Sequence, residues 1–329
     1  MVRLCGLFGK SRQAYYQRRN YIYRDEVAAE ILRQLVAKER KRMPRLGGRK
    51  LLKLIQPKLP QELSLGRDAF FDFLRRQDLL VRNKRRWAKT TQSHHWLKKY
   101  PNLIVDFTPT ASGQLWVSDI TYVSTNEGFG YLSLVTDAYS RKIIGWCLGP
   151  NLEAKHTVKA LKMALRQLPK ESKGVYHHSD RGVQYCCDDY VKLLKKHKFQ
   201  ISMTENGDPL ENPIAERVNG ILKNEWLHDL NFETIDQANG TLRGIIQTYN
   251  QYRPHTSLDM LTPEKAHHHH GTLKRHWKNY YKQVINNELK LNTIVAEAQD
   301  AEKQLVNTNT YGLFTKHQSY ESPPRPPSG

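Results

Sequence analysis

Strand-like and helix-like patterns follow one another from residue 114 onward in an order that few folds can accommodate. Three strand patterns come first, and the short turn DAYSR joins the second to the third, which implies antiparallel pairing. The strand patterns occupy residues 114–124, 130–136, 142–148, 175–180 and 199–203, and the helical patterns occupy 153–168, 187–197 and a segment that starts at 212. This order predicts an α/β fold of the ribonuclease-H-like kind. Helices should cover a mixed five-stranded sheet in which the first and fourth strands lie side by side.

The net charge of +20 is concentrated in the first third of the chain. Residues 1–100 hold 26 Lys and Arg against 8 Asp and Glu, so this part alone carries +18. A basic module joined to a nearly neutral remainder predicts one part that holds a polyanion, for which nucleic acid is the best candidate. An acidic membrane surface fits less well, because no segment pairs the basic residues with an exposed apolar face. Binding to RNA stays open on charge alone.

Three short helical patterns, at residues 25–40, 49–56 and 68–77, fall within this basic part. With their basic, polar connections they predict a small all-α domain of the helix-turn-helix type over residues 1–90, linker included. The alternative is a helical bundle whose Lys and Arg side chains are only solvated. The run RNKRRWAK near the end of the domain supplies candidate DNA contacts at Arg82, Lys84, Arg85 and Arg86.

No targeting or membrane segment is evident. The apolar runs stay well short of the roughly 18 to 20 residues that a membrane span needs, and the N-terminus lacks the core of a signal peptide. The four cysteines form no CxxC pair, so they indicate neither a disulfide framework nor a zinc ribbon. We therefore expect a cytoplasmic protein with reduced thiols.

Two aspartates lie in or at the end of predicted strands. Asp119 sits among Val, Ile, Tyr and Trp, where a carboxylate is costly to bury unless something positive holds it. Asp180 ends the strand VYHHSD and opens the turn DRG. The alternatives are an aspartate that faces water on an edge strand for the first and a common turn residue for the second. If the first and fourth strands are neighbours, the two carboxylates converge.

The segment at residues 206–226 crowds four carboxylates together, and helical geometry singles out one of them. Asn212 followed by Pro213 predicts the start of a helix, with Asn as the N-cap and Pro as the first helical residue. The apolar side of this helix falls opposite Glu216 and is formed by Ile214, Val218 and Ile221. The helix therefore attaches to the sheet by its apolar side and presents Glu216 outward.

The side of the helix that carries Glu216 also carries Lys223, two turns further on, with Asn219 between them. Of the other three carboxylates, one falls on the apolar side and two precede the helix in a loop: Glu225, then Asp208 and Glu211. Glu216 is therefore the favoured carboxylate, and the alternative is an ordinary solvated surface helix.

Carboxylates from three separate elements suit divalent cations. Hard cations such as Mg²⁺ take oxygen ligands, and a two-ion site needs carboxylates that converge on ions about 3.5 to 4 Å apart. Asp119, Asp180 and Glu216 meet this need if the helix begins near the end of the same sheet. Such a site supports in-line attack on a phosphodiester, in which one ion activates the nucleophile and the other stabilises the leaving oxygen.

The sequence around these residues is more specific than their spacing. The motifs are WVSDITYV at the first aspartate, HHSDRGVQY at the second and NPIAERVNGILKNE at the glutamate, with 60 and 35 residues between the carboxylates. A later segment reads YNQYRPHTSLDMLTPEKA. Together they resemble the bacterial insertion-sequence transposases whose second reading frame encodes a DDE integrase core, relatives of the retroviral integrases. The resemblance covers roughly residues 4–266.

The resemblance implies roles for individual residues. Asp119, Asp180 and Glu216 would be the catalytic residues and would bind two ions, Mg²⁺ or Mn²⁺. Lys223 would contact the transposon end. Arg217 departs from the family's usual aromatic or small residue, and its positive charge makes it a further candidate contact to DNA.

For the whole chain, the resemblance implies a DNA transposase that cleaves at the ends of its element and transfers the strand into target DNA. The catalytic core is expected over residues 105–270, and a partly disordered C-terminal extension over 271–329. The expected partners are the DNA at the element ends, the target DNA, further copies of the chain and the product of an upstream DNA-binding reading frame. When it binds DNA, the protein is expected at the nucleoid. The alternative is a catalytically inactive DNA-binding regulator derived from a transposase. The tract His267–His270 is interpreted as an adventitious run in a loop, and a metal site is the alternative.

Overall fold

The structure is a computed structural model, and it describes residues 9, 11–81, 97–168, 174–205 and 211–274. Several sequence-based predictions lie outside the described residues. They concern the basic residues Arg82, Lys84, Arg85 and Arg86, the carboxylate of Asp208, and almost all of the C-terminal extension. Among the described helices, none is both long enough and apolar enough to cross a membrane.

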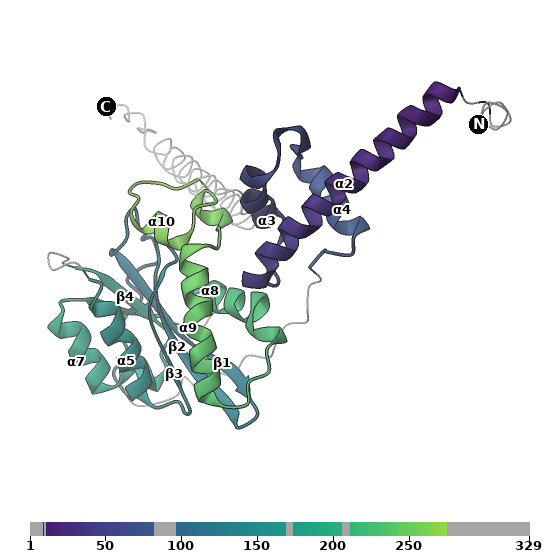
Figure 1. Cartoon of the computed structure of the whole chain (residues 1–329). Coiled ribbons are helices and arrows are strands. Elements are labelled where there is room, and N and C mark those ends of the chain that lie inside the picture. Colours follow the sequence, from purple (N-terminus) through teal and green to yellow (C-terminus); the bar gives the residue numbers. More distant parts are fainter. Residues whose placement is uncertain (1–8, 10, 82–96, 169–173, 206–210, 275–329) are drawn as a thin grey trace, which may run out of the picture. The chain divides into compact units, whose positions relative to one another are not determined.

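A mixed sheet of five strands forms the centre of the fold, as predicted (Figure 1). Its strands are β1 (Leu115–Thr125), β2 (Gly128–Asp137), β3 (Ile143–Gly149), β4 (Tyr176–Ser179) and β5 (Gln200–Met203). Their order is β3-β2-β1-β4-β5, and β1, β2 and β3 pair in antiparallel fashion while β4 runs parallel to β1 and β5. The prediction that the first and fourth strands are neighbours is confirmed.

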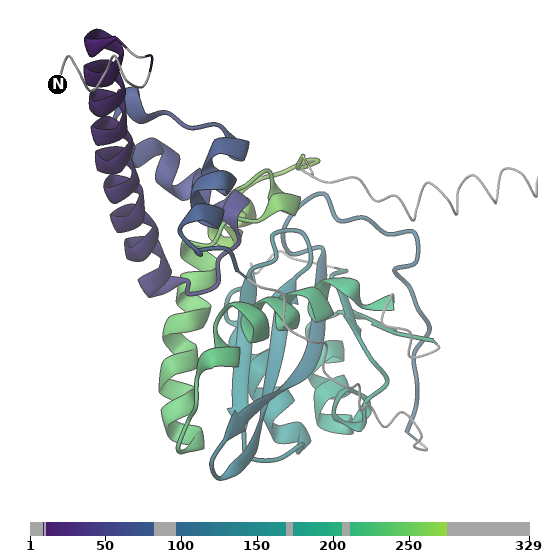
Figure 2. The ribbon, with the colours of Figure 1, turned by 90° about the vertical axis from the view of Figure 1, so that its right-hand side faces the viewer.

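Helices cover both faces of this sheet (Figures 1 and 2). One face carries α5 (Ala154–Leu165), the short α6 (Val183–Cys186) and α7 (Asp188–Lys196), and the other carries α8 (Pro213–Glu225) and α9 (Ile235–Gln251). Residues of β1 divide between the faces, because Trp116 and Ile120 pack with α5 and α7 whereas Val123 packs with α8 and α9. This alternation is the strand period of two that predicted β1.

The first described helix, α2 (Arg12–Arg42), is longer than the predicted helix at residues 25–40. Its start is set by Ser11, whose side chain accepts a hydrogen bond from the amide of Ala14 at 3.0 Å. Residues 12–24 show no apolar periodicity, so no pattern in the sequence signals this part of the helix. The boundary prediction was therefore wrong by more than three turns at this end.

The next two helices, α3 (Gly48–Ile55) and α4 (Arg67–Arg76), match their predictions to within two residues. Together with α2 they pack around apolar residues that belong to the same cluster as those of α8 and α9, namely Leu32, Val36, Leu51, Ile55, Phe70 and Leu74. The indole of Trp226, at the end of α8, donates a hydrogen bond to the carbonyl of Arg42 at 2.8 Å. The division of the chain into domains at residues 90 and 105 stays a prediction.

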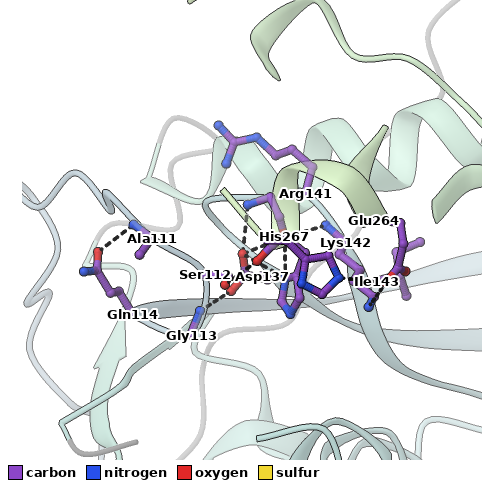
Figure 3. Close-up of polar contacts among 12 residues, drawn as sticks. Ala111, Ser112, Gly113, Gln114, Asp137, Arg141, Lys142, Ile143, Glu264 and His267 are labelled. Carbon is purple, nitrogen blue, oxygen red and sulfur yellow. Dashed lines mark hydrogen bonds and ion pairs between the residues drawn. The ribbon is translucent and has the colours of Figure 1, made fainter. Parts of the chain in front are cut away.

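The turn between β2 and β3 anchors the last described helix, α10 (Pro263–His267) (Figure 3). Asp137, the last residue of β2, is fully buried, and it accepts hydrogen bonds from the amide of Gly113 and the hydroxyl of Ser140 in the turn, each at 2.7 Å. The same hydroxyl lies 3.0 Å from Nδ1 of His267. The interpretation of the histidine tract as part of a loop is therefore wrong for His267, which ends a helix and holds it against the sheet.

Candidate active site

Asp119 lies on the central strand of the sheet, just beyond the part of β1 that pairs with β4. That pairing involves Leu115–Val117, while β2 continues alongside and places Leu134 opposite Asp119. The carboxylate is partly buried, and its Oδ1 accepts a hydrogen bond from the amide of Ile120 at 2.8 Å. Its Oδ2 accepts another from the side-chain amide of Asn219 at 2.7 Å. An aspartate that faces water on an edge strand is excluded, because β1 is central.

Asp180 directly follows the last residue of β4. The last pair of the parallel ladder is Val117 and His178, so Asp119 and Asp180 each lie two residues beyond it, and the charge of Asp180 adds to burial in raising the pKa of Asp119. The Oδ1 of Asp180 also accepts a hydrogen bond from the amide of Gly182 at 3.0 Å. Asp180 thus has the turn-forming contact that its residue type suggests and a position next to the first carboxylate.

The three candidate carboxylates influence one another electrostatically. The pKa of Asp119 is raised from its usual 3.8 to about 7, chiefly by burial and further by the negative charges of Asp180 and Glu216. The hydrogen bonds from the Ile120 amide and from Asn219 oppose it. Such repulsion is typical of carboxylates that share one site.

Two asparagines attach α8 to β1 on either side of Glu216. Asn212 donates a hydrogen bond from Nδ2 to the carbonyl of Ser118 at 3.0 Å, and Asn219 donates to Asp119 at 2.7 Å. Seven residues complete nearly two helical turns, so both asparagines lie on the same side of the helix. Asn212 occupies the predicted N-cap position, but its side chain caps no helical amide and reaches β1 instead.

The buried side of α8 is turned slightly from the predicted one. Its buried residues are Ala215, Val218, Asn219, Ile221 and Leu222. Ile214, predicted to be part of the apolar side, is only partly buried. Asn219, predicted to lie outward beside Glu216, is 6% exposed and faces Asp119. Glu216 itself is exposed, as predicted.

Lys223 lies partly buried beside the carboxylates. Burial lowers the pKa of its ammonium group, and the charge of Asp119 opposes that shift. Its Nζ is 5.9 Å from the centroid of the Tyr122 ring. Arg217 is exposed on the same helix. The assignment of Lys223 and Arg217 as DNA contacts stays a prediction.

Comparison of the sequence with known proteins shows to which family the chain belongs. Two family models described as integrase core domain match residues 109–209 and 197–263. The "Insertion element IS600 uncharacterized 31 kDa protein" of Shigella sonnei is 35% identical over 266 residues, which cover 79% of this chain and 96% of that protein. "Transposase InsF for insertion sequence IS3A" of Escherichia coli K12 is 36% identical over 194 residues, which cover 58% of this chain and 67% of that protein. The chain belongs to the insertion-sequence transposases with an integrase core.

Solved structures overlap with the transposase over its core. The HTLV-2 integrase catalytic core domain in complex with magnesium is 19% identical with a TM-score of 0.38, and covers 48% of this chain and 98% of its own. The catalytic domain of Mos1 mariner transposase is 15% identical with a TM-score of 0.34, and covers 40% of this chain and 76% of its own. The sheet order and register described above define the fold of the transposase.

Two buried histidines, which the sequence analysis did not single out, tie β4 of the transposase to its neighbours. His177 Nε2 lies 2.9 Å from the hydroxyl of Ser118 and 2.8 Å from that of Tyr190, and His178 Nδ1 lies 2.9 Å from the hydroxyl of Ser202. Burial lowers the pKa of His177 to about 3 and that of His178 to about 4. Both imidazoles are therefore neutral at pH 7 and serve to position β4.

A buried arginine in the segment YNQYRPH was also missed. Arg253 is 2% exposed, and its guanidinium donates two hydrogen bonds to the carboxylate of Glu225 at 2.7 and 2.6 Å. Glu225 lies on the buried side of α8, as helical geometry predicted, and its partner explains how a charge is accommodated there. The sequence did contain a signal for this arginine, because Glu225 is a charged residue on the apolar side of a helix and such a residue needs a partner of opposite charge.

Proposed function

We propose that this transposase cleaves DNA at the ends of its element and transfers the cut strand into target DNA, with Asp119, Asp180 and Glu216 as ligands of two divalent cations. The proposal is supported by the strand register, in which Asp119 and Asp180 hold matching positions two residues beyond the last pair of β1 and β4, and by the repulsion that Asp180 and Glu216 exert on Asp119. Polynucleotidyl transfer is the reaction class of the family. Mg²⁺ and Mn²⁺ suit the site because hard cations prefer carboxylate oxygens.

The residues present fit such ions chemically. The raised pKa of Asp119 reflects burial and the repulsion from Asp180. A divalent cation would stabilise the ionised carboxylate and so offset both effects. Within the described residues no three His, Cys, Asp or Glu side chains are already grouped as ligands of one ion. We therefore expect the ions and a DNA phosphate to draw the carboxylates together when they bind.

The neighbouring residues of the chain prepare the carboxylates for this task. When bound, the ions supply an activated nucleophile and stabilise the leaving oxygen. Asn219 holds Oδ2 of Asp119 in place, and Asn212 fixes the start of the helix that carries Glu216. Lys223 offers a positive charge beside Asp119 for a DNA phosphate.

The proposal extends to partners. The substrates are the terminal sequences of the element and target DNA, and joining two ends to one target requires more than one protomer. The product of an upstream reading frame is a further candidate partner, and the nucleoid in the cytoplasm is the place of action. The basic residues of the N-terminal helices would hold DNA by neutralising phosphates.

The proposal is tested by cleavage of a duplex that ends in the terminal sequence of the element, with Mg²⁺ present. Asp180→Asn and Glu216→Gln should each slow cleavage by about 100-fold or more, because each removes a ligand of the catalytic ions. Asp189→Asn is the matched control, since it removes an exposed carboxylate from α7. Wild-type protein that binds this DNA but never cleaves it, with Mg²⁺ or Mn²⁺, would support the inactive regulator instead.

A further inference from the structure

Three aromatic residues form a strip on the hairpin of β1 and β2 that belongs to no part of the apolar core. Tyr122 and Tyr131 face each other across the two strands, with ring centroids 5.2 Å apart. The ring of Phe129 packs edge-on against Tyr122 at 5.9 Å and is 59% exposed. Within the described residues, none of the three is part of a core cluster or packs against one. Phe129 is exposed and the two tyrosines are partly buried, and an aromatic group that reaches the surface in this way indicates a binding partner.

The strip begins beside the candidate active site. Tyr122 lies three residues after Asp119 on β1, about 10 Å along an extended strand, so the two side chains leave the strand on opposite faces. β4 pairs with β1 only over Leu115–Val117, so the edge of β1 next to Tyr122 is not covered by that strand. Lys223 lies between the strip and the candidate active site. Its Nζ is 5.9 Å from the Tyr122 centroid, and the charge of Asp119 opposes the burial that lowers the pKa of its ammonium group.

A nucleic-acid strand with unpaired bases fits this combination of groups. Aromatic side chains bind single strands by stacking on bases, and adjacent cations neutralise the phosphates that connect those bases. Bases in an intact duplex are already stacked on one another, so the rings need a frayed or single-stranded end. The cation next to the strip is the partly buried Lys223, and its charge has the sign that attracts a polyanion.

We propose that Tyr122 and Phe129, backed by Tyr131, form a stacking surface for unpaired bases of the DNA strand whose phosphate lies at the carboxylates, with Lys223 neutralising that strand. This inference rests on the proposed function, since it assumes that DNA is the substrate. It adds a place for the bases next to the place for the phosphate.

The test uses the full-length protein and two DNAs, a blunt duplex with the terminal sequence and the same duplex with a single-stranded overhang that carries 2-aminopurine. Tyr122→Leu and Phe129→Leu should each weaken binding of the overhang DNA about fivefold or more and leave binding of the blunt duplex unchanged. Tyr122→Phe keeps the ring and should bind like wild type. Tyr252→Leu, which removes a ring that is 47% exposed at the end of α9, is the matched control.

In wild type, stacking should also quench the 2-aminopurine fluorescence, and both Leu variants should restore it. Equal losses for both DNAs, or unchanged affinity for the overhang in both Leu variants, would overturn the inference. A fall in self-association of these variants with unchanged DNA binding would overturn it too and assign the strip to a second protein chain. If wild type bound neither DNA, the proposed function itself would fail, and this inference with it.

Discussion

Removing the charge of Glu225 is expected to lower the free energy of unfolding of the transposase by about 3 to 5 kcal/mol. This carboxylate, at the end of α8, accepts hydrogen bonds from Arg253 at 2.6 and 2.7 Å and from Lys50 of α3 at 3.0 Å. The side chains of Arg253, Glu225 and Lys50 are 2%, 12% and 17% exposed. Glu225→Gln leaves two buried cations facing one another without their anion, and an unpaired buried charge accounts for this magnitude.

The two cations should not contribute equally. Burial and then the charge of Arg253 lower the pKa of Lys50 to about 8, and Glu225 only partly offsets these effects. The ammonium of Lys50 is therefore costly to bury, and Lys50→Met should change the free energy of unfolding by no more than about 1 kcal/mol. Combining Glu225→Gln with Arg253→Met should recover part of the loss, because the buried guanidinium is then absent as well.

Urea denaturation at pH 7, followed by tryptophan fluorescence, measures these differences at constant m-value. As the pH rises from about 8 to 10, folded Lys50 loses its proton before unfolded Lys50 does, so wild type should gain stability relative to Lys50→Met. A loss below about 1 kcal/mol for Glu225→Gln, or a larger loss for Lys50→Met than for Glu225→Gln, would show that Glu225 is not what stabilises the two buried cations.

Three further predictions concern the active site and the basic helices. Burial and the neighbouring carboxylates raise the pKa of Asp119 from 3.8 to about 7, so folded protein holds this proton more tightly than unfolded protein does, and the stability of the metal-free protein should fall as the pH rises from about 4 to 7. Thermal denaturation in EDTA should show this fall in wild type but not in Asp119→Asn. Asn219→Ala removes the hydrogen bond that opposes the shift, so the pH–rate profile of cleavage should move to higher pH, and an unmoved profile would contradict the assigned hydrogen bond. Lys38, Lys41 and Lys53 are exposed on the N-terminal helices, and replacing all three by Gln should weaken the salt dependence of DNA binding. The slope of the logarithm of the DNA-binding constant against the logarithm of the salt concentration should become shallower by about 0.9 for each phosphate that is no longer neutralised. An unchanged slope would place the DNA-binding residues elsewhere.

Much of the sheet could be predicted because its signals are local. The alternation of apolar residues along β1 and the short turn after β2 together determine which strands pair and how. Helical geometry likewise selected Glu216 as the exposed carboxylate of α8 and put Glu225 on the buried side. Each of these inferences needs only neighbours within about two helical turns or one strand.

The polar contacts that support the site could not be predicted, because their partners lie far away in the sequence. Asn219 is buried since it meets Asp119, 100 residues earlier, and His267 is held by Ser140, 127 residues earlier. Considered locally, both are ordinary polar residues on a helix. The N-terminal half of α2 was missed for a different reason, because it lacks the apolar periodicity that marks a packed helix.

The most direct test of the account is strand transfer, in which a labelled element end is joined to target DNA in the presence of Mg²⁺. Wild type should join the two DNAs, whereas Asp119→Asn, Asp180→Asn and Glu216→Gln should each lower joining to background while still binding the end. Chelation of the metal should have the same effect on wild type. Joining that survives in any one of these three variants would contradict the assignment of the active site.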